Sequence, residues 1–250
     1  MKRGEFMNDY MTQFNNFSNQ YNPYYANPEW NNYLENTNVV SGQMNSCFCK
    51  KSFFRVLNTY TNELDVQVNE IVMAENLNAG EFTRYVKLNP GTYQVKIYKS
   101  EPKRLIFESM IDIENNLSYT GVIAVDDEDK TDISVLMIPE AKENAIIGKM
   151  AAVRLINLAV DAPDLELIAS DKTILFSGIN CGDVSSNVAV PSGLYTLTLK
   201  ERKSKKDIKT ITVDFAPRMH YTLFVYGKYD ETPDVKIIIP EDGVNYLELC

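Results

Sequence analysis

An internal repeat constrains this 250-residue chain more than any other feature. Four short landmarks occur twice, in the same order, with the copies 99 to 102 positions apart. They are Arg55–Asn58 and Arg154–Asn157, Leu88–Tyr93 and Val190–Tyr195, Ser118–Thr120 and His220–Thr222, and Ile138-Pro139 and Ile239-Pro240. Four landmarks at so constant an offset indicate two copies of one unit, each of about 90–100 residues.

Apolar residues alternate with polar ones throughout both copies. Leu64–Val68, Tyr93–Ile97 and Tyr195–Leu199 follow this period of two, and Gly121–Val125 and Tyr221–Tyr226 are apolar on both sides. The first pattern is typical of antiparallel strands with one wet face, and the second is typical of central strands. The sequence therefore predicts an all-β chain. We expect two tandem antiparallel β-sandwiches, at 53–139 and 151–250, with a linker at 140–150 and a C-terminal extension after the second sandwich.

Each copy carries the same signal for a tight entry into a strand. A Pro and a Gly stand just before a Tyr-led alternating run, which requires a turn that glycine adopts easily. The residues predicted to form these structural turns are Pro90, Gly91 and Tyr93 in the first copy and Pro191, Gly193 and Tyr195 in the second.

These segments resemble a bacterial family of domains of unknown function, DUF4397. Its members have an Arg-Val-x-Asn/His strand, an Asp-Ala-Pro-x-x-Asp turn and a Leu-Pro-x-Gly-x-Tyr entry, and 154–167 with 190–199 are similar to them. The resemblance covers about 53–240 as two copies, although the first has Thr59–Asn62 where the Asp-Ala-Pro turn should be. It implies immunoglobulin-like or transthyretin-like sandwiches in a surface or envelope setting. It brings no catalytic residues.

Residues 1–50 differ from the rest of the chain. They contain 11 Asn and 10 aromatic residues, almost no aliphatic ones, and no sustained periodicity. Such a segment is either a disordered tail or an irregular arm that becomes ordered on a neighbouring subunit, since exposed aromatics are costly in water. The aromatics predicted to act in assembly are Tyr10, Phe14, Phe17, Tyr21, Tyr24, Tyr25, Trp30 and Tyr33.

Charge and motif content exclude several function classes. The net charge of −9 disfavours nucleic acid and anionic membranes as main partners, and no apolar stretch is long enough to insert into a membrane. The N-terminus lacks the apolar core of a Sec signal, so we expect synthesis in the cytoplasm. Enzyme motifs are absent, and the single histidine, His220, is matched by Ser118 in the first copy. We therefore predict no enzyme activity, no catalytic residues, no metal and no cofactor.

The four cysteines lie outside the alternating runs. Cys47 and Cys49 stand at the end of the arm, Cys181 lies in a loop, and Cys250 is the last residue. They are either ordinary thiols in a reducing cytosol or candidates for intermolecular disulfides.

Two charged segments each have an ordinary and a functional interpretation. The acidic 126–129 segment is interpreted as a solvated loop rather than a calcium site, because the spacing of a calcium loop is missing. The basic run at 200–206, matched by 99–104, is interpreted as a hairpin tip rather than a polyanion site.

Three functions remain open from the sequence, and an enzyme is the least favoured of them. The first is a non-enzymatic structural protein of a cell or spore surface, which self-assembles into a fibre or coat through its arm and intermolecular disulfides. Its partners would be copies of itself and other surface or coat proteins. A spore setting would reconcile a surface-type sandwich with the lack of an export signal. The alternative is a surface module for ligand binding or adhesion, with glycans as the favoured ligand class.

Overall fold

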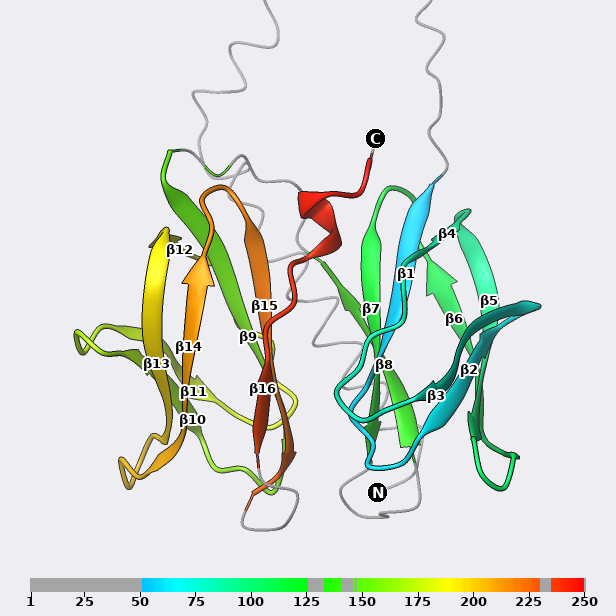
Figure 1. Cartoon of the computed structure of the whole chain (residues 1–250), viewed down its shortest axis with the longest axis horizontal. Helices are drawn as coiled ribbons and strands as arrows, with labels where there is room; N and C mark the ends of the chain where they lie inside the picture. Colours follow the sequence, from blue (N-terminus) through cyan, green and yellow to red (C-terminus); the bar gives the residue numbers. More distant parts are fainter. Residues whose placement is uncertain (1–50, 126–132, 141–145, 147, 230–234, 250) are drawn as a thin grey trace, which may run out of the picture. The chain divides into compact units, whose positions relative to one another are not determined.

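The computed structural model describes residues 51–125, 133–140, 146, 148–229 and 235–249, and these residues form strands and one short 3-10 helix (Figure 1). The first copy contains β1 (Ser52–Asn58), β2 (Leu64–Val68), β3 (Ile71–Leu77), β4 (Val86–Leu88), β5 (Gly91–Lys99), β6 (Arg104–Ile113), β7 (Ser118–Val125) and β8 (Ile133–Pro139). The second contains β9 (Met150–Val160), β10 (Leu165–Ala169), β11 (Ile174–Ile179), β12 (Val188–Pro191), β13 (Gly193–Glu201), β14 (Asp207–Phe215), β15 (His220–Lys228) and β16 (Lys236–Ile238), followed by η2 (Gly243–Asn245).

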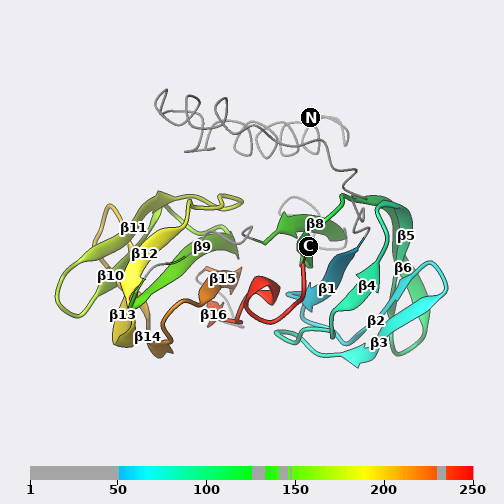
Figure 2. The same cartoon turned by 90° about the horizontal axis from the view of Figure 1, so that it is seen from above.

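Each copy folds into two four-stranded sheets around its own apolar core (Figure 2). In the first copy the β1 sheet has the order β4-β1-β7-β8 and the β2 sheet has the order β3-β2-β5-β6. In the second, the β9 sheet is β12-β9-β15-β16 and the β10 sheet is β11-β10-β13-β14. The prediction of an all-β chain with two tandem sandwiches is confirmed, and β7 and β15 are central strands as expected.

One pairing in each copy departs from the antiparallel prediction. β1 pairs with β7 in parallel, and β9 pairs with β15 in parallel, whereas the neighbouring pairs are antiparallel. A period of two reports which side of a strand is buried but not the direction of its neighbour. The sequence therefore could not distinguish these two pairs from the others.

The structure aligns the two copies at an offset of 102 over their later strands. Gly91 and Gly193 begin β5 and β13, and both have a positive φ, +151° and +140°. The hydroxyl of Tyr93 donates to the carbonyl of Asn89 (2.9 Å), and Tyr195 does the same to Pro191 (2.8 Å). The proline landmarks shift by one position, because Pro139 pairs with Tyr119 whereas Glu241, not Pro240, pairs with Tyr221.

The repeated asparagine that ends β1 has a structural function. The Asn58 amide donates to the carbonyls of Asn62 (2.9 Å) and Leu77 (2.8 Å), and its oxygen accepts from the backbone of Tyr60. Asn157 makes the matching bonds with Ile179 and Ala159. One buried amide thus anchors the following loop in both copies, even though the Asp-Ala-Pro turn is present only in the second.

Both sandwiches belong to one compact unit, Phe48–Cys250. Their β1 and β9 sheets bury apolar side chains that belong to neither core, including Leu57, Val122, Ile156 and Phe224. Phe82 packs edge-on against Phe224 with ring centroids 6.0 Å apart, and Tyr85 packs against Tyr246. The outer faces of the central strands therefore form an interface between the two copies.

Two buried arginines cross this interface in a reciprocal arrangement, which we call the arginine clamp. It contains Arg55, Thr120 and Glu140 from the first copy and Arg154, Thr222 and Asp242 from the second. Within each copy, the arginine Nε donates to the threonine hydroxyl, and that hydroxyl donates to the carboxylate at 3.0 and 2.7 Å. Each arginine also donates to a backbone carbonyl of the other copy, Arg154 to Pro139 (2.9 Å) and Arg55 to Glu241 (3.5 Å).

Glu140 is the most heavily bonded member of the arginine clamp. Its side chain is 1% exposed and lies 3.1 Å from Arg55 Nη2. It also accepts from Ser118 (2.8 Å), from the backbone of Gly243 (2.6 Å) and from Tyr85. The sequence placed Glu140 at the start of a linker, but in the structure it ties the C-terminal segment to the first copy.

Asp242 is the counterpart of Glu140 in the second copy, and its pKa is raised. Burial raises the pKa of the Asp242 carboxyl above its ordinary value, and the nearby Arg154 guanidinium opposes that effect. Among the described residues, Asp242 Oδ2 and Arg154 Nη2 have no hydrogen-bond partner. Since bonds of the arginine clamp join the two sandwiches, we expect each sandwich to stabilise the other.

Candidate functional site

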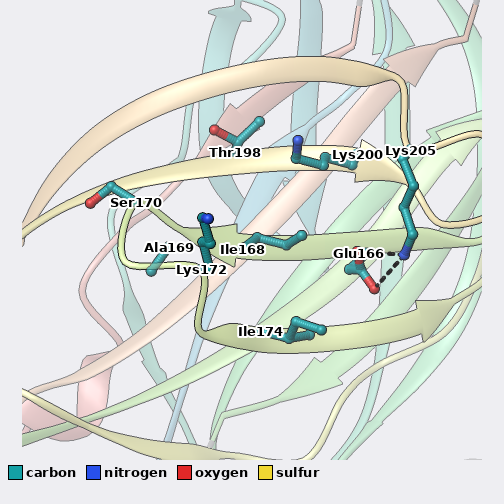
Figure 3. Close-up of a pocket in the computed structure, with 9 residues that line it drawn as sticks. All are labelled: Glu166, Ile168, Ala169, Ser170, Lys172, Ile174, Thr198, Lys200 and Lys205. Carbon is teal, nitrogen blue, oxygen red and sulfur yellow. Dashed lines mark hydrogen bonds and ion pairs between the residues drawn. The ribbon is translucent and has the colours of Figure 1, made fainter.

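A groove of about 530 Å³ lies on the β10 sheet of the second copy (Figure 3). The edge and central strands β11, β10 and β13 supply its floor, and the turn after β10 and the β13–β14 hairpin tip supply its ends. Its lining residues are Glu166, Ile168, Ala169, Ser170, Lys172, Ile174, Thr198, Lys200 and Lys205. None of these residues is aromatic.

Strand register explains how the lining is assembled. Ile168 pairs with Ile174 on one side and with Thr198 on the other, which makes one row across the sheet. Two residues away along β10, Glu166 pairs with Lys200, which makes a charged row beside it. Because side chains two apart on a strand share a face, both rows face the groove.

The groove has an excess of positive charge. Glu166, its one lining carboxylate, has a side chain 4% exposed, and its oxygens lie 3.0 and 3.3 Å from Lys205 Nζ (Figure 3). Lys200 lies 2.6 Å from Asp207. The Lys172 ammonium is exposed and makes no ion pair with any residue that the structure describes. Lys172 is thus available to a ligand.

The chemistry of this lining could hold a ligand. Glu166, the one carboxylate of the lining, accepts a hydrogen bond from Lys205. The ammonium groups and the hydroxyls of Ser170 and Thr198 can donate to an anionic, hydroxylated ligand, and Ile168 and Ile174 supply an apolar floor.

The first copy repeats the ion pair of the groove but not the rest of its lining. Lys103 Nζ lies 3.1 Å from Asp65 Oδ2, and the corresponding distance from Lys205 Nζ to Glu166 Oε1 is 3.0 Å. On the neighbouring row, Gln67 and Lys96 stand opposite each other where the second copy has Ile168 and Thr198. Both basic runs form hairpin tips, as predicted, since they join β5 to β6 and β13 to β14. The lining of the groove is therefore not repeated in the first copy.

A second repeated turn, which was not predicted from the sequence, occurs at Asn78–Glu81 and Asn180–Asp183. In both, the acidic side chain accepts from the backbone and the amide of the asparagine, and the glycine has a positive φ (+87° and +90°). The spacing Asn-x-Gly-Glu/Asp is the signal that would have identified it. Cys181 lies in the second of these turns and is exposed.

Several predicted site residues lie outside the described residues. These are the arm aromatics Tyr10, Phe14, Phe17, Tyr21, Tyr24, Tyr25, Trp30 and Tyr33, the cysteines Cys47, Cys49 and Cys250, and the acidic loop at 126–129. Within the described ranges, no three His, Cys, Asp or Glu side chains gather as a metal site would require. No helix in that part of the chain is long and apolar enough to cross a membrane.

The chain thus contains two tandem sandwiches, each made of two four-stranded sheets, and Arg55 and Arg154 join them. This arrangement defines a duplicated all-β unit. The chain belongs to the family described as "Domain of unknown function (DUF4397)", whose model matches residues 52–168 and 151–244. The two matches confirm the tandem copies. No curated protein matches the chain.

Solved structures that resemble the chain include two carbohydrate-binding modules. One is the family 26 module CBMbc of Eubacterium rectale Amy13K in complex with maltoheptaose, at 9% identity and a TM-score of 0.25, covering 75% of this chain and 96% of the module. The other is a family 41 module from streptococcal virulence factors, at 12% identity and a TM-score of 0.25, covering 74% and 96%. Similarities of this size equate no residue of this chain with a glucan-binding residue.

Proposed function

We propose that this protein is a non-enzymatic binding module that holds an acidic glycan in the groove of its second sandwich. The observation that carries the proposal is the exposed ammonium of Lys172 above a floor of aliphatic and hydroxyl side chains. An ammonium pairs with a carboxylate or sulfate group, and hydroxyls exchange hydrogen bonds with sugar hydroxyls. The absence of aromatic residues from the lining disfavours a neutral sugar, which would be held chiefly by stacking.

The charge of the whole chain makes such a site selective. A net charge of −9 repels polyanions from most of the surface, so binding requires the local excess of lysine. The buried Glu166 keeps Lys205 in place, and the short pair with Asp207 keeps Lys200 in place. A ligand anion would therefore pair with Lys172 beside two ammonium groups, those of Lys200 and Lys205, that ion pairs hold in place.

Calorimetric titration with polygalacturonate, and with amylose as a neutral glucan, tests the proposal. We expect the acidic glycan to bind with an affinity that falls as salt rises, and the neutral one to bind no more than weakly. Lys172→Glu should lower the affinity by about tenfold or more, which corresponds to about 1.4 kcal/mol.

Lys96→Glu is the matched control for this substitution. Lys96 lies on β5 at the position that corresponds to Thr198, and its substitution changes the net charge by the same amount as Lys172→Glu. It should leave the affinity unchanged. Equal binding by the wild type and the Lys172 variant, or tighter binding of amylose than of polygalacturonate, would contradict an acidic-glycan site.

Self-assembly through residues 1–50 and disulfides is the second candidate function, in the setting of a cell or spore surface. The observation that favours it is the exposure of Cys181 in the Asn180–Asp183 turn, where a disulfide to another copy would not disturb the core. We expect deletion of residues 1–50 to abolish filaments seen by electron microscopy. Cys181→Ser should leave filaments that dissociate in hot detergent without reductant. Filaments of normal length from the truncated chain would rule out assembly by the arm.

A further inference from the structure

The free edge of the β10 sheet is the most regular open edge in the described part of the chain. β14 ends that sheet, and its pairing with β13 runs without interruption from Lys209 to Phe215. By comparison, β4, β12 and β16 are three or four residues long, and β3 and β11 contain register shifts. The edges formed by β6 and β8 lie close to each other. β14 is therefore the edge most able to accept another strand.

The composition of β14 lacks the usual protection of an edge. Its last eight residues, Ile208–Phe215, are rich in Ile, Thr and Val, contain no Gly or Pro, and carry one Lys and one Asp that balance in charge. Natural edges are normally blunted by net charge, Pro or bulges. A neutral segment with high β-propensity and exposed backbone donors instead favours pairing.

We propose that β14 pairs antiparallel with β14 of a second molecule of this protein. The pairing joins the two β10 sheets into one sheet, to which each molecule contributes four strands. A register centred on Thr212 places Thr212 opposite its own equivalent, Thr210 opposite Asp214, and Ile211 opposite Val213. Outward-facing residues then meet outward-facing ones, and on the inward face Ile211 meets Val213 while Lys209 stands opposite Phe215. Pairing of this kind is self-complementary, as a two-fold contact requires.

The corresponding strand of the first copy shows why the contact would be specific to β14. Met110 and Glu108 occupy the positions on β6 that correspond to Thr212 and Thr210. If β6 paired with β6 of a second molecule in the same register, Glu108 of one molecule would stand opposite Asp112 of the other. Like charges directly opposite each other destabilise a strand pair, so β6 opposes the association that β14 allows.

The pairing would also strengthen ligand binding, and this consequence rests on the proposed function. A two-fold axis through paired edges keeps the outward faces of both β10 sheets on the same side. Two grooves would then open on one surface, and a polymeric ligand could occupy both. The second binding event would be intramolecular, so avidity would exceed the affinity of one groove.

Sedimentation velocity of the full chain in reductant, from 1 to 100 μM, tests the pairing without disulfides. One strand edge buries a small interface, so we expect association at roughly micromolar concentrations or above. Thr212→Lys should weaken that association at least tenfold, because it places two lysines opposite each other at the centre of the contact. Mixing this variant with Thr212→Glu should restore the association through opposite charges.

The matched control is Met110→Lys, which adds a lysine at the position of β6 that corresponds to Thr212. It should associate as the wild type does. A wild-type chain that sediments like the Thr212→Lys variant at every concentration, or a mixture of the two charged variants that stays dissociated, would overturn the proposal. Binding of one ligand per chain by a monomeric protein would leave the groove intact and remove only the pairing.

Discussion

Glu140→Ala is expected to lower the free energy of unfolding by about 3–5 kcal/mol, because it breaks a buried ion pair from one side. Arg55, whose side chain is 6% exposed in the intact pair, would remain at the interface with its charged partner gone. Ser118 and the backbone of Gly243 would lose an acceptor at the same time. Urea unfolding followed by circular dichroism measures the change.

The control for this variant is Lys103→Ala, which breaks the ion pair with Asp65. The Lys103 side chain is 63% exposed, so its loss should cost less than about 1 kcal/mol. A Glu140→Ala protein within 1 kcal/mol of the wild type would mean that the two sandwiches are stable without the arginine clamp.

The arginine clamp also shows what the sequence does and does not predict. Repetition of Arg55 and Arg154 is visible in the sequence, and a charged residue within an otherwise apolar strand is a signal that some partner must compensate it. The partner was not visible, since Glu140 follows β8 in a segment whose composition is typical of a solvent-exposed linker. Burial of that glutamate depends on the second copy, which contributes Gly243 and Glu241.

The groove was beyond sequence reasoning for a related reason. Its lining residues come from β10, β11, β13 and the hairpin tip, and they become neighbours through cross-strand pairing. The alternation of residues predicted each strand and its wet face, but not which wet residues stand opposite each other. Register is set by the whole sandwich, whereas a period of two is a local property.

Strand turns lie at the other extreme, because their causes are local. Gly91 and Gly193 have backbone angles that other residues adopt with strain, and each is followed two positions later by a tyrosine that closes the turn. The residues that such a turn requires lie within a few consecutive positions of the sequence. The repeat doubled the signal, which is why these positions could be predicted without a structure.

At one pair of core positions the two copies have a large and a small side chain in opposite order. This difference predicts a second large effect on stability. A side-chain carbon added at Gly121 would lie 2.8 Å from two atoms of the Phe54 ring, which is fully buried. The corresponding residues of the second copy are Leu223 and Val153, both fully buried. Each core therefore contains one large and one smaller residue at this pair of positions, in opposite order.

Gly121→Leu alone is expected to cost at least about 3 kcal/mol, because the added atoms overlap the Phe54 ring in a core that has no space for them. Phe54→Val alone should cost about 2 kcal/mol through the cavity it leaves. The double variant recreates the pair found in the second copy, so its loss of stability should be smaller than the sum by more than 1 kcal/mol. Urea unfolding of the four proteins gives this coupling, and recovery of soluble, folded double variant where Gly121→Leu does not fold would show the same compensation. Additive costs would mean that the two positions do not share one space, and that the copies pack their cores independently.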